Sequence, residues 1–370
     1  MERIIFLVAL TNYLCPVREV DYIIVGLGIA GISFCEQLEK HHKSYLVIDS
    51  GANAATKVSG GVFNPVVLKR FTIAWKAKEE MARSLLFYKE LSSKLKIPIV
   101  YETSVLRILN SVQEQNDWIV ASDRIELAPY LDSEILKNNN PNIIAPFGFG
   151  KVKVAGRIFP SVLLESYRSY LLEKSALISE TFDHSQLSEE GSKVYYKDIV
   201  SSKVVFSEGI GGLKNPYFPK GPFIRGKEHF IPNKGEYVTI KAPELKLRTL
   251  LKGPIFVMPW GEDLYKVGAS YKREDSSSGI TEESREIVLT KLRKMIACDF
   301  EVVSQEAGIR PTTKDRRPFL GSMVNSPNMV FFNGLGTHGI MNAPFLAEIL
   351  YNHLENGQEL PEEMDIKRCV

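Results

Sequence analysis

Apolar runs and amphipathic stretches alternate along the first 50 residues. The run DYIIVG at 21–26 is short, apolar and rich in β-branched residues, which predicts a buried strand. After it, Ile29, Ile32 and Leu38 recur at roughly helical spacing, and SYLVIDS at 44–50 predicts a second buried strand. A strand–helix–strand unit of about 30 residues predicts a parallel pair of strands with a right-handed crossover.

The same patterns continue along the rest of the chain. Helical periodicity predicts helices over 74–95, 156–174 and 284–296, and an apolar run ending in a glycine cluster predicts a strand over 203–212. Strand-like segments fill the remainder: IPIVYETSVLRIL and DWIVAS within 97–125, then 235–240, 253–260, 263–271, 301–311 and 329–332. Because 235–271 holds several strands with no helix between them, we expect a mostly antiparallel sheet there.

The order of these elements indicates two interleaved domains. Parallel-type units occur at both ends and in the middle of the chain, with antiparallel segments between them. We therefore expect a mixed α/β and α+β protein, with one Rossmann-like domain and a second, discontinuous domain built on a mostly antiparallel sheet. The expected boundaries are an N-terminal extension at 1–20, the Rossmann-like domain at 21–95, 145–215 and 305–370, and the second domain at 96–144 and 216–304.

Composition is that of an ordinary globular protein. The 370 residues are 44% apolar and 24% charged, with a formal net charge of +2, so no overall field favours nucleic acid. The basic runs at 291–294 and 314–317 are interpreted as solvated faces. No stretch approaches the ~20 apolar residues of a membrane span. The run IIFLVAL near the N-terminus lacks a small-residue cleavage site, so we expect an extra strand or a loose extension.

The cysteines exclude a zinc site of the usual spacing. The four residues Cys15, Cys35, Cys298 and Cys369 are scattered, without a CxxC pair and without histidines at ligand spacing. We expect reduced thiols, a cytoplasmic location and no metal.

A glycine-rich loop follows the first predicted strand. Gly26, Gly28 and Gly31 form GxGxxG at the start of the helix, and Asp49 ends the second strand at about the offset expected for a carboxylate that binds a ribose. The helix N-terminus offers N–H groups to a pyrophosphate. The loop therefore predicts a bound dinucleotide, either NAD or FAD, in contact with these residues and with Ile29, Ala30 and Ser50.

A second glycine-rich loop, NGLGTHGIMNAP at 333–344, lies near the C-terminus. It follows the strand at 329–332 and precedes a helix in which Pro344 suits the first turn and Gly357 the C-terminal stop. An extended FAD needs a helix N-terminus at its pyrophosphate and another at the flavin edge that becomes negative on reduction. FAD therefore explains both loops, and the expected contacts to it from the glycine cluster and the second loop are Gly209, Gly334, Leu335, Gly336, Thr337, His338, Gly339 and Ile340.

Taken together, several motifs resemble the D-amino-acid-oxidase and glycine-oxidase family of FAD-dependent oxidoreductases. These are VGLGIAGIS, SGGVFNP, GKVKVAGRIFPSVLLESYRSYL, YKVGASY, EAGIRPTTKDRRPFLG and NGLGTHGIMNAPFLAEIL, spread over residues 20–358. The last motif is also similar to the FAD domain of the bifunctional tRNA wobble-uridine modification enzyme. The resemblance implies that the Rossmann-like domain binds FAD and that the second is a substrate domain whose antiparallel sheet roofs the flavin. It also implies a place near the flavin for Ser59, Gly60 and Gly61, and non-covalent FAD, since no cysteine matches the covalent anchor of sarcosine oxidases.

The resemblance also implies candidate catalytic residues. Arg310 matches the arginine that holds the substrate carboxylate, a role that suits a planar guanidinium. His338 lies in the loop expected to face the flavin, either at its N1/C2=O edge or at the substrate. On the expected roof, alternate residues must face the cavity, but the sequence leaves their parity open; of Met258, Trp260, Tyr265 and Tyr271 we prefer Tyr265.

We therefore expect an oxidoreductase that acts on the C–N bond of an amino acid or secondary amine carrying a carboxylate. Hydride transfer from Cα to flavin N5 would give an imino acid that water hydrolyses, with oxygen or another acceptor reoxidising the flavin. The partner is then a small molecule and not a nucleic acid. An alternative is the removal of a carboxymethyl group from a modified wobble uridine in tRNA, which predicts a basic rim around the site. A flavin-binding protein without turnover, or an NAD-binding module, is a third possibility.

Overall fold

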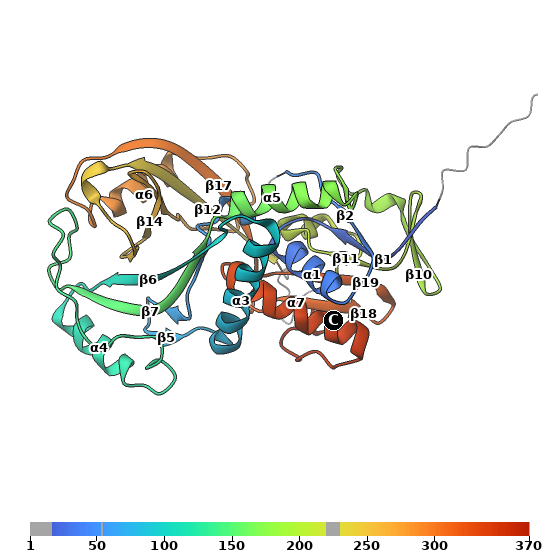
Figure 1. Cartoon of the computed structure of the whole chain (residues 1–370), viewed down its shortest axis with the longest axis horizontal. Helices are drawn as coiled ribbons and strands as arrows, with labels where there is room; N and C mark the ends of the chain where they lie inside the picture. Colours follow the sequence, from blue (N-terminus) through green and yellow to red (C-terminus); the bar gives the residue numbers. More distant parts are fainter. Residues whose placement is uncertain (1–16, 53–54, 220–229, 370) are drawn as a thin grey trace, which may run out of the picture.

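The computed structural model describes residues 17–52, 55–219 and 230–369, whose strands form two large sheets. Figure 1 shows the strands of the first sheet on the right and those of the second on the left, with α3 and α5 in the middle of the molecule. Each sheet collects segments that lie far apart in the sequence.

The first sheet is mainly parallel at its centre. Its order is β18-β19-β11-β1-β2-β8, with the β9–β10 hairpin beside β11. The pairs β19–β11, β11–β1, β1–β2 and β2–β8 are parallel. Its strands are β1 (Arg18–Val25), β2 (Tyr45–Ile48), β8 (Leu177–Ile178), β9 (Leu187–Glu190), β10 (Lys193–Tyr196), β11 (Ile199–Phe206), β18 (Phe319–Met323) and β19 (Ser326–Asn333).

The second sheet runs β16-β12-β15-β14-β13-β6-β7-β3, with β17 also paired to β12. In the described residues its pairs are antiparallel except for β6 with β13. Its strands are β3 (Val62–Phe63), β6 (Val100–Ile108), β7 (Phe149–Ile158), β12 (Phe230–Lys241), β13 (Leu250–Lys252), β14 (Phe256–Gly261), β15 (Leu264–Gly268), β16 (Lys272–Arg273) and β17 (Glu301–Thr313). A small hairpin pairs β4 (Val66–Val67) with β5 (Thr72–Ile73).

Helices cover both sheets. The α-helices are α1 (Ile29–Lys40), α2 (Ala55–Val58), α3 (Ala77–Leu95), α4 (Val112–Ser122), α5 (Pro160–Glu173), α6 (Glu282–Leu292) and α7 (Gly339–Asn356). Short 3₁₀ turns are η1 (His184–Gln186), η2 (Gly209–Lys214), η3 (Pro243–Leu245) and η4 (Ile366–Cys369). In the first sheet's main core, α1 and α3 both pack against α7, and Phe34, Phe332 and Leu346 are fully buried. Burial of each such side chain stabilises the fold by about 1.5–3 kcal/mol.

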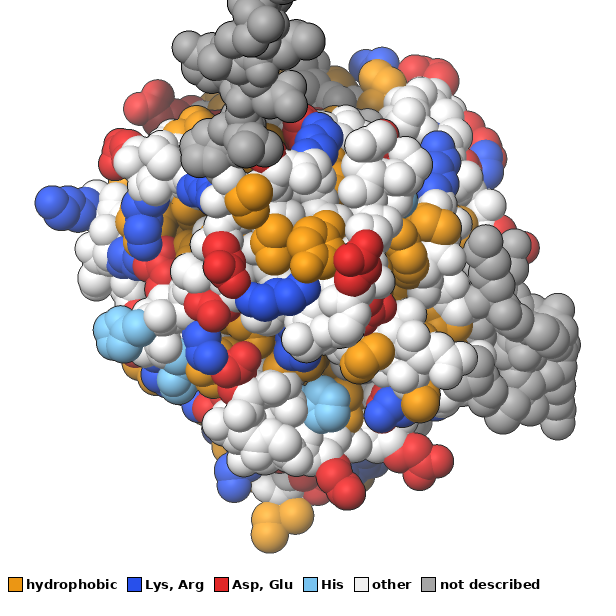
Figure 2. Space-filling view, turned by 90° about the vertical axis from the view of Figure 1, so that its right-hand side faces the viewer, with side chains coloured by type: hydrophobic (Ala, Val, Ile, Leu, Met, Phe, Trp, Pro, Cys, Tyr) orange, Lys and Arg blue, Asp and Glu red, His pale blue; other side chains and the backbone are white. Residues whose placement is uncertain are grey.

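Charged side chains of both signs are mixed on the surface. Figure 2 shows the face at the right-hand end of Figure 1, where Lys and Arg lie among Asp and Glu and hydrophobic side chains form small groups. This mixture agrees with the net charge of +2. No helix of the described residues is long and apolar enough to cross a membrane.

The predicted strand–helix–strand unit is confirmed. β1 and β2 are parallel neighbours joined through α1, and Ile23, Ile24 and Val25 are each at most 3% exposed. Strands buried on both faces need such continuous apolar runs. The helix predicted over 74–95 is also confirmed as α3.

The segment DWIVAS, predicted as a strand, lies in α4 instead. Ser111 is its N-cap and accepts a hydrogen bond from the Glu114 N–H at 3.1 Å. The Glu114 carboxylate in turn accepts from the Asn110 N–H at 2.9 Å. The S-x-x-E pattern of a helix start was readable in the sequence, and Trp118 and Ala121 lie on the buried face.

Two predicted helix starts were also wrong. The first residues of 156–174 belong to β7, and α5 begins only at Pro160. The last helix begins at Gly339, so Pro344 lies inside α7 rather than in its first turn. Proline cannot donate to the carbonyl four residues earlier, and the Tyr88 hydroxyl donates to that Ile340 carbonyl at 2.7 Å. A tertiary contact thus satisfies the acceptor that the proline leaves open.

The sheets divide the chain differently from the predicted boundaries. β7 and most of β17 lie in ranges assigned to the Rossmann-like domain, yet both belong to the second sheet. β1 already begins at Arg18, inside the expected N-terminal extension, and the IIFLVAL run lies outside the described residues. Periodicity along the chain predicts that a segment is a strand, but it cannot reveal to which of the two sheets the strand belongs.

A carboxyl group is buried in α3 without a hydrogen-bond partner for one of its oxygens. Glu80 is 1% exposed, and its Oε1 has no partner in the structure. Burial, assisted by Glu79 and opposed by Lys76 and Arg317, raises the pKa of Glu80 to about 8. Glu80 is therefore neutral at pH 7.

We expect this residue to make stability fall as the pH rises. Between the unfolded pKa near 4.5 and the folded pKa of about 8, the folded state holds a proton that the unfolded state has released, so the free energy of unfolding decreases with pH. Glu80→Gln should remove this decrease and raise the melting temperature at pH 8–9 relative to the unmodified protein. Thermal unfolding followed by circular dichroism from pH 5 to pH 9 measures it. Glu90→Gln, an exposed glutamate of the same helix, should leave the decrease intact; equal pH profiles for Glu80→Gln and the unmodified protein would contradict the assignment.

Candidate active site

One cavity of about 450 Å³ collects both glycine loops and the inner face of the second sheet. This volume lies within the ~300–1,000 Å³ of typical ligand pockets. Gly26 and Gly336, from opposite ends of the chain, both line it. Of the predicted site residues, those that line the cavity are Gly26, Gly28, Ile29, Ala30, Asp49, Ser59, Gly60, Gly61, Gly209, Arg310, Leu335, Gly336, Thr337, His338, Gly339 and Ile340.

The first glycine loop is held between β1 and β11. Gly26 has φ +97°, a conformation that favours glycine. A Cβ on Gly31 would lie 2.1 Å from the Gly26 carbonyl oxygen, so α1 can approach the loop only with glycine there. The Ile29 N–H of the first helical turn donates to Thr56 Oγ1 at 3.1 Å. The loop thus presents the N-terminus of α1 to the cavity.

Asp49 joins the end of β2 to this loop. Its Oδ2 accepts from the Leu27 N–H at 2.9 Å, and its Oδ1 accepts from the Gly51 N–H at 2.7 Å. Arg168 of α5 donates to the same Oδ1 at 2.8 Å and also to Ser179 Oγ at 2.8 Å. The carboxylate is therefore oriented by three donors, while it still lines the cavity.

The second glycine loop brings the start of α7 to the cavity. Gly336 has φ +57°, and its N–H donates to the Pro311 carbonyl at 3.1 Å, which ties the loop to β17. Asn333 Nδ2 donates to the Gly209 carbonyl at 2.9 Å and ties the loop to η2. The N-terminus of this 18-residue helix points into the same space as that of α1.

His338 is the N-cap of α7 and can be reached from the cavity. The protein around the cavity desolvates its imidazole, and this desolvation together with the charge of Arg316 lowers its pKa. Thr337 Oγ1 lies 3.1 Å from His338 Nδ1. The ring is therefore neutral at pH 7 and can exchange hydrogen bonds without adding a charge.

Arg310 lies on the cavity wall with an open donor. It faces Asn233 across the β12–β17 pair, and its guanidinium passes directly over Gly235, where a Cβ would come within 2.2 Å of Nη1. Nη1 is buried without a hydrogen-bond partner, and no ion pair of Arg310 is found in the described residues. A buried unpartnered guanidinium nitrogen indicates a site for an anionic ligand.

The pleat of the second sheet decides which aromatic residues face the cavity. Met258 lines it and is paired with Lys266, so Lys266 points to the same face of the sheet. Tyr265 is the neighbour of Lys266 in β15 and therefore faces the other way. Tyr265 is 4% exposed in the core against α6, and its hydroxyl accepts from the Leu247 N–H at 3.2 Å. The preference for Tyr265 was therefore wrong.

Other predicted residues do not reach the cavity either. Gly31 packs against Gly26 as described, and Gly334, with φ +75°, lies against Thr313 and Phe319. Ser50 is exposed and its Oγ accepts from the Ala52 N–H. Of the remaining roof candidates, Tyr271 lines the cavity and Trp260 does not.

Several lining residues were missed by the sequence analysis. Tyr237 and Phe256 face the cavity beside Met258, and Glu208 lines it where η2 begins. Glu208 is held by His184 Nε2 at 2.9 Å and Asn215 Nδ2 at 2.7 Å. The alternation of GEYVTI contained the signal for Tyr237, but only the pairing of β12 shows which of its faces is covered.

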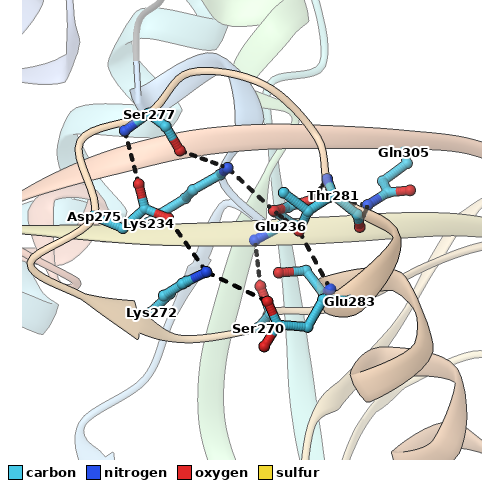
Figure 3. A network of polar contacts seen from close by, with 10 residues as sticks. Lys234, Glu236, Ser270, Lys272, Asp275, Ser277, Thr281, Glu283 and Gln305 are labelled. Atoms are coloured by element: carbon cyan, nitrogen blue, oxygen red, sulfur yellow. Dashed lines mark hydrogen bonds and ion pairs between the residues drawn. The ribbon is translucent and has the colours of Figure 1, made fainter.

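Two buried ion pairs flank this wall, one on each face of the second sheet. Lys234 and Glu236, at most 2% exposed, lie with Nζ and Oε1 3.4 Å apart. Figure 3 shows Glu236 as the centre of a network in which Thr281 and Gln305 donate to its carboxylate, at 2.8 and 2.7 Å. Burial raises the pKa of Glu236, but these hydrogen bonds outweigh it and leave the pKa below its usual value. The Ser270 N–H donates to the Glu236 carbonyl at 3.0 Å, so the network also fixes the cavity-lining segment 269–271.

The second pair joins Lys266 to Glu306. Lys266 is 1% exposed, and its Nζ lies 2.8 Å from Glu306 Oε2. The ammonium also lies over the rings of Trp260 and Tyr237, at 4.6 and 5.2 Å from their centroids. Burial lowers the pKa of Lys266, and the contact with Glu306 opposes this. Unlike Arg310, this buried cation already has its carboxylate.

Comparison with known proteins assigns the family. Residues 21–352 match the family described as FAD dependent oxidoreductase, and the chain belongs to it. The protein is an FAD-dependent oxidoreductase, and the two helix N-termini and the glycine cradle at one cavity fit this cofactor.

Individual relatives are distant, and the glycine oxidases among them cover most of the chain. Glycine oxidase of Bacillus subtilis is 22% identical over 362 residues, which span 92% of this chain and 94% of that protein. The tRNA 5-methylaminomethyl-2-thiouridine biosynthesis bifunctional protein MnmC of Idiomarina loihiensis is 27% identical over 145 residues, 38% of this chain and 23% of that protein. The crystal structure of glycine oxidase from Bacillus cereus has a TM-score of 0.75 at 20% identity, with 92% and 96% of the two chains covered.

Asp49→Asn should weaken the binding of FAD. The amide of the variant has only one accepting oxygen, so it cannot accept from both Leu27 and Arg168. The glycine loop then loses part of what orients it. Hydrogen bonds to charged groups contribute about 1.5–3 kcal/mol each, so we expect the dissociation constant to rise about tenfold or more. Titration of apoprotein with FAD, followed by quenching of flavin fluorescence, measures this constant. Glu102→Gln, which removes an exposed carboxylate paired with Lys89, should leave it unchanged. An unaltered dissociation constant for Asp49→Asn would show that the acid has no part in holding the cofactor.

Proposed function

We propose that this enzyme oxidises the C–N bond of an amino acid or a secondary amine that carries a carboxylate. The observation that carries the proposal is the buried, unpartnered Nη1 of Arg310 on the wall of the cavity. A guanidinium without a carboxylate of its own protein is suited to bind one from a ligand through two parallel hydrogen bonds. The similarity to glycine oxidase supports the same substrate class.

The residues of the cavity suggest how the cofactor would be held. We propose that the loop at Gly26 and Gly28 receives the pyrophosphate and that the loop from Leu335 to Ile340 faces the flavin. Bound FAD would supply the acceptor for the electrons and hydrogen that leave the carbon beside the nitrogen. The cofactor would be held non-covalently, since none of the cysteines in the described part of the chain lines the cavity.

The chain itself would orient the substrate and exclude water. Arg310 fixes the carboxylate and thereby the adjoining carbon, and Tyr237, Phe256 and Met258 form the less polar part of the wall. Neutral His338 can accept or donate a hydrogen bond at the end of α7 without competing for the carboxylate. No protein base is required if the amine binds in its neutral form, because the nitrogen lone pair assists the oxidation.

A tRNA substrate is the alternative, and the charges beside the cavity do not favour it. The exposed Lys272 and Arg273 follow the cavity-lining Tyr271. In a basic rim that binds tRNA, these two cations would not be paired with carboxylates of the protein. Instead, Lys272 lies 3.3 Å from Glu283, and Arg273 lies 3.7 Å from Glu274. This part of the rim is balanced in charge, which supports a small-molecule substrate.

Arg310→Ala should abolish most activity toward carboxylate-bearing amines. Loss of two charge-assisted hydrogen bonds, each contributing about 1.5–3 kcal/mol, predicts that kcat/KM falls about 100-fold or more. Anaerobic bleaching of the flavin by glycine, sarcosine, proline and D-amino acids identifies the substrate, and stopped-flow bleaching then gives the rate for each variant. Arg285→Ala, which removes an exposed arginine of α6, is the matched control.

Two results would contradict this proposal. A holoenzyme that no carboxylate-bearing amine bleaches is not an amine oxidase of this kind. Equal kcat/KM values for Arg310→Ala and the unmodified enzyme would exclude Arg310 as the anchor. Bleaching by a tRNA that carries the carboxymethylaminomethyl group, with none by free amines, would establish the alternative.

A further inference from the structure

Two acids line the cavity in the described part of the chain, and both come from the first sheet. Asp49 follows the end of β2, and Glu208 follows the end of β11. The strands of the second sheet contribute Arg310 to the lining but no carboxylate. Glu208 was not expected from the sequence, and an acid next to a pyrophosphate would repel it. Its place in the cavity therefore needs an explanation.

The order of the strands places the two acids on either side of the first glycine loop. β11, β1 and β2 are adjacent and parallel (Figure 1), so their carboxyl ends lie at the same edge of the sheet. Gly26 follows β1, and a Cβ on Gly26 would lie 3.2 Å from Glu208 Cα. On the other side, Asp49 accepts from the Leu27 N–H of the same loop at 2.9 Å. The glycine loop thus lies between Asp49 and Glu208.

The carboxylate of Glu208 is fixed in place but not saturated with hydrogen bonds. His184 Nε2 lies 2.9 Å from its Oε1, and Asn215 Nδ2 donates to its Oε2 at 2.7 Å. Asn215 is 3% exposed and is itself fixed, because its Oδ1 accepts from the Tyr217 N–H at 2.8 Å. Each carboxylate oxygen can accept two hydrogen bonds, so among the described residues each keeps one position open. The side chain of Glu208 is 11% exposed.

FAD carries hydroxyl groups on both sides of its pyrophosphate. One set belongs to the ribose of the adenosine, and the other belongs to the ribityl chain that bears the flavin. The proposed placement puts the pyrophosphate at Gly26 and Gly28 and the flavin at the loop from Leu335 to Ile340, which follows β19. Because β11 lies between β1 and β19 in the sheet, Glu208 lies between these two loops, where the ribityl chain would pass.

We propose that Glu208 accepts a hydrogen bond from a hydroxyl group of the ribityl chain and thereby positions the flavin half of FAD. Asp49 serves the adenosine half in the same way. The hydrogen bonds that each acid accepts offset its repulsion of the pyrophosphate. His184 and Asn215 act through Glu208, because they hold its carboxylate in place. The inference rests on the proposed function only through the placement of FAD, and it holds for any amine substrate.

The two halves of FAD, used as separate ligands, test this inference. Isothermal titration calorimetry of the full-length apoprotein gives the dissociation constants of FAD, of ADP, which lacks the ribityl chain, and of FMN, which lacks the adenosine. Glu208→Ala should raise the constants of FAD and FMN about tenfold, the effect of one hydrogen bond to a charged group, and should not raise that of ADP. Asp49→Asn should raise the constants of FAD and ADP and leave that of FMN unchanged.

The sign of the change separates a hydrogen bond from a simple charge effect. Removal of an acid near the pyrophosphate reduces repulsion, so charge alone predicts that Glu208→Ala binds FAD more tightly. Glu208→Gln keeps the size of the side chain and an acceptor for Asn215. It should weaken the binding of FAD and FMN about threefold, because neutral hydrogen bonds are weaker than charge-assisted ones. Glu180→Gln, which removes an acid bonded to Lys197 outside the cavity, should leave all three constants unchanged.

Three results would overturn the inference. The first is a Glu208→Ala variant that binds FAD as tightly as the unmodified protein or more tightly. The second is an equal weakening of FAD and ADP, which would assign Glu208 to the adenosine half or to the fold. The third is an Asp49→Asn variant that leaves ADP unchanged, because the proposed placement of FAD would then be wrong. If Glu208→Ala does not fold, as judged by circular dichroism, the same comparison with Glu208→Gln decides. Bleaching of the flavin by an amine decides the proposed function independently of these constants.

Discussion

The pairing of β12 with β17 is the contact on which the site depends. Their register runs from Phe230 opposite Thr313 to Lys241 opposite Glu301. It places Gly235 under the guanidinium of Arg310 and opposes Asn233 to the same residue. A slip of one residue would turn Arg310 away from the cavity and bring the Lys234–Glu236 side toward it, because side chains alternate between the two faces. The packing of α6 and the apolar core on that other face makes such a slip costly.

The two glycine loops form the other half of the site, and strand pairing positions them as well. The N-termini of α1 and α7 meet at one cavity because β1 and β19 both pair with β11 in the first sheet. Each loop is tied down by residues outside it: Thr56, Asp49 and Arg168 hold the first, and Pro311 and Gly209 hold the second. Helix N-termini that are fixed in this way can stabilise negative charge without reorganising when a ligand binds.

Arg310 differs from the other charged residues around the cavity in having no ion-pair partner among the described residues. Lys234 has Glu236, Lys266 has Glu306 and Asp49 has Arg168, so each of these pairs serves the framework of the wall. Arg310 lies on the same wall and keeps a nitrogen without a partner. Arg310 thus differs from the charged residues of these three pairs, and this difference supports the proposal that its partner is an anion from outside the protein.

The sequence by itself determined the parts of the protein that depend on near neighbours. The strand–glycine loop–helix–strand unit, the acid at Asp49, the helix predicted over 74–95 and the second glycine loop all follow from local spacing and from the conformations that glycine permits. The resemblance in its motifs added the FAD family and the role expected for Arg310. Local patterns failed where a cap was overlooked, as in α4, and where a proline was taken as the start of a helix, as in α7. Only the tertiary structure decided that Tyr265 lies in a core while Tyr237 and Met258 face the cavity, that β7 and β17 belong to the second sheet, and that Glu208 lies beside the first glycine loop. These facts depend on which strands pair and in which register, and pairing between segments 60 to 83 residues apart, as in β12 and β17, leaves no periodic trace along the chain.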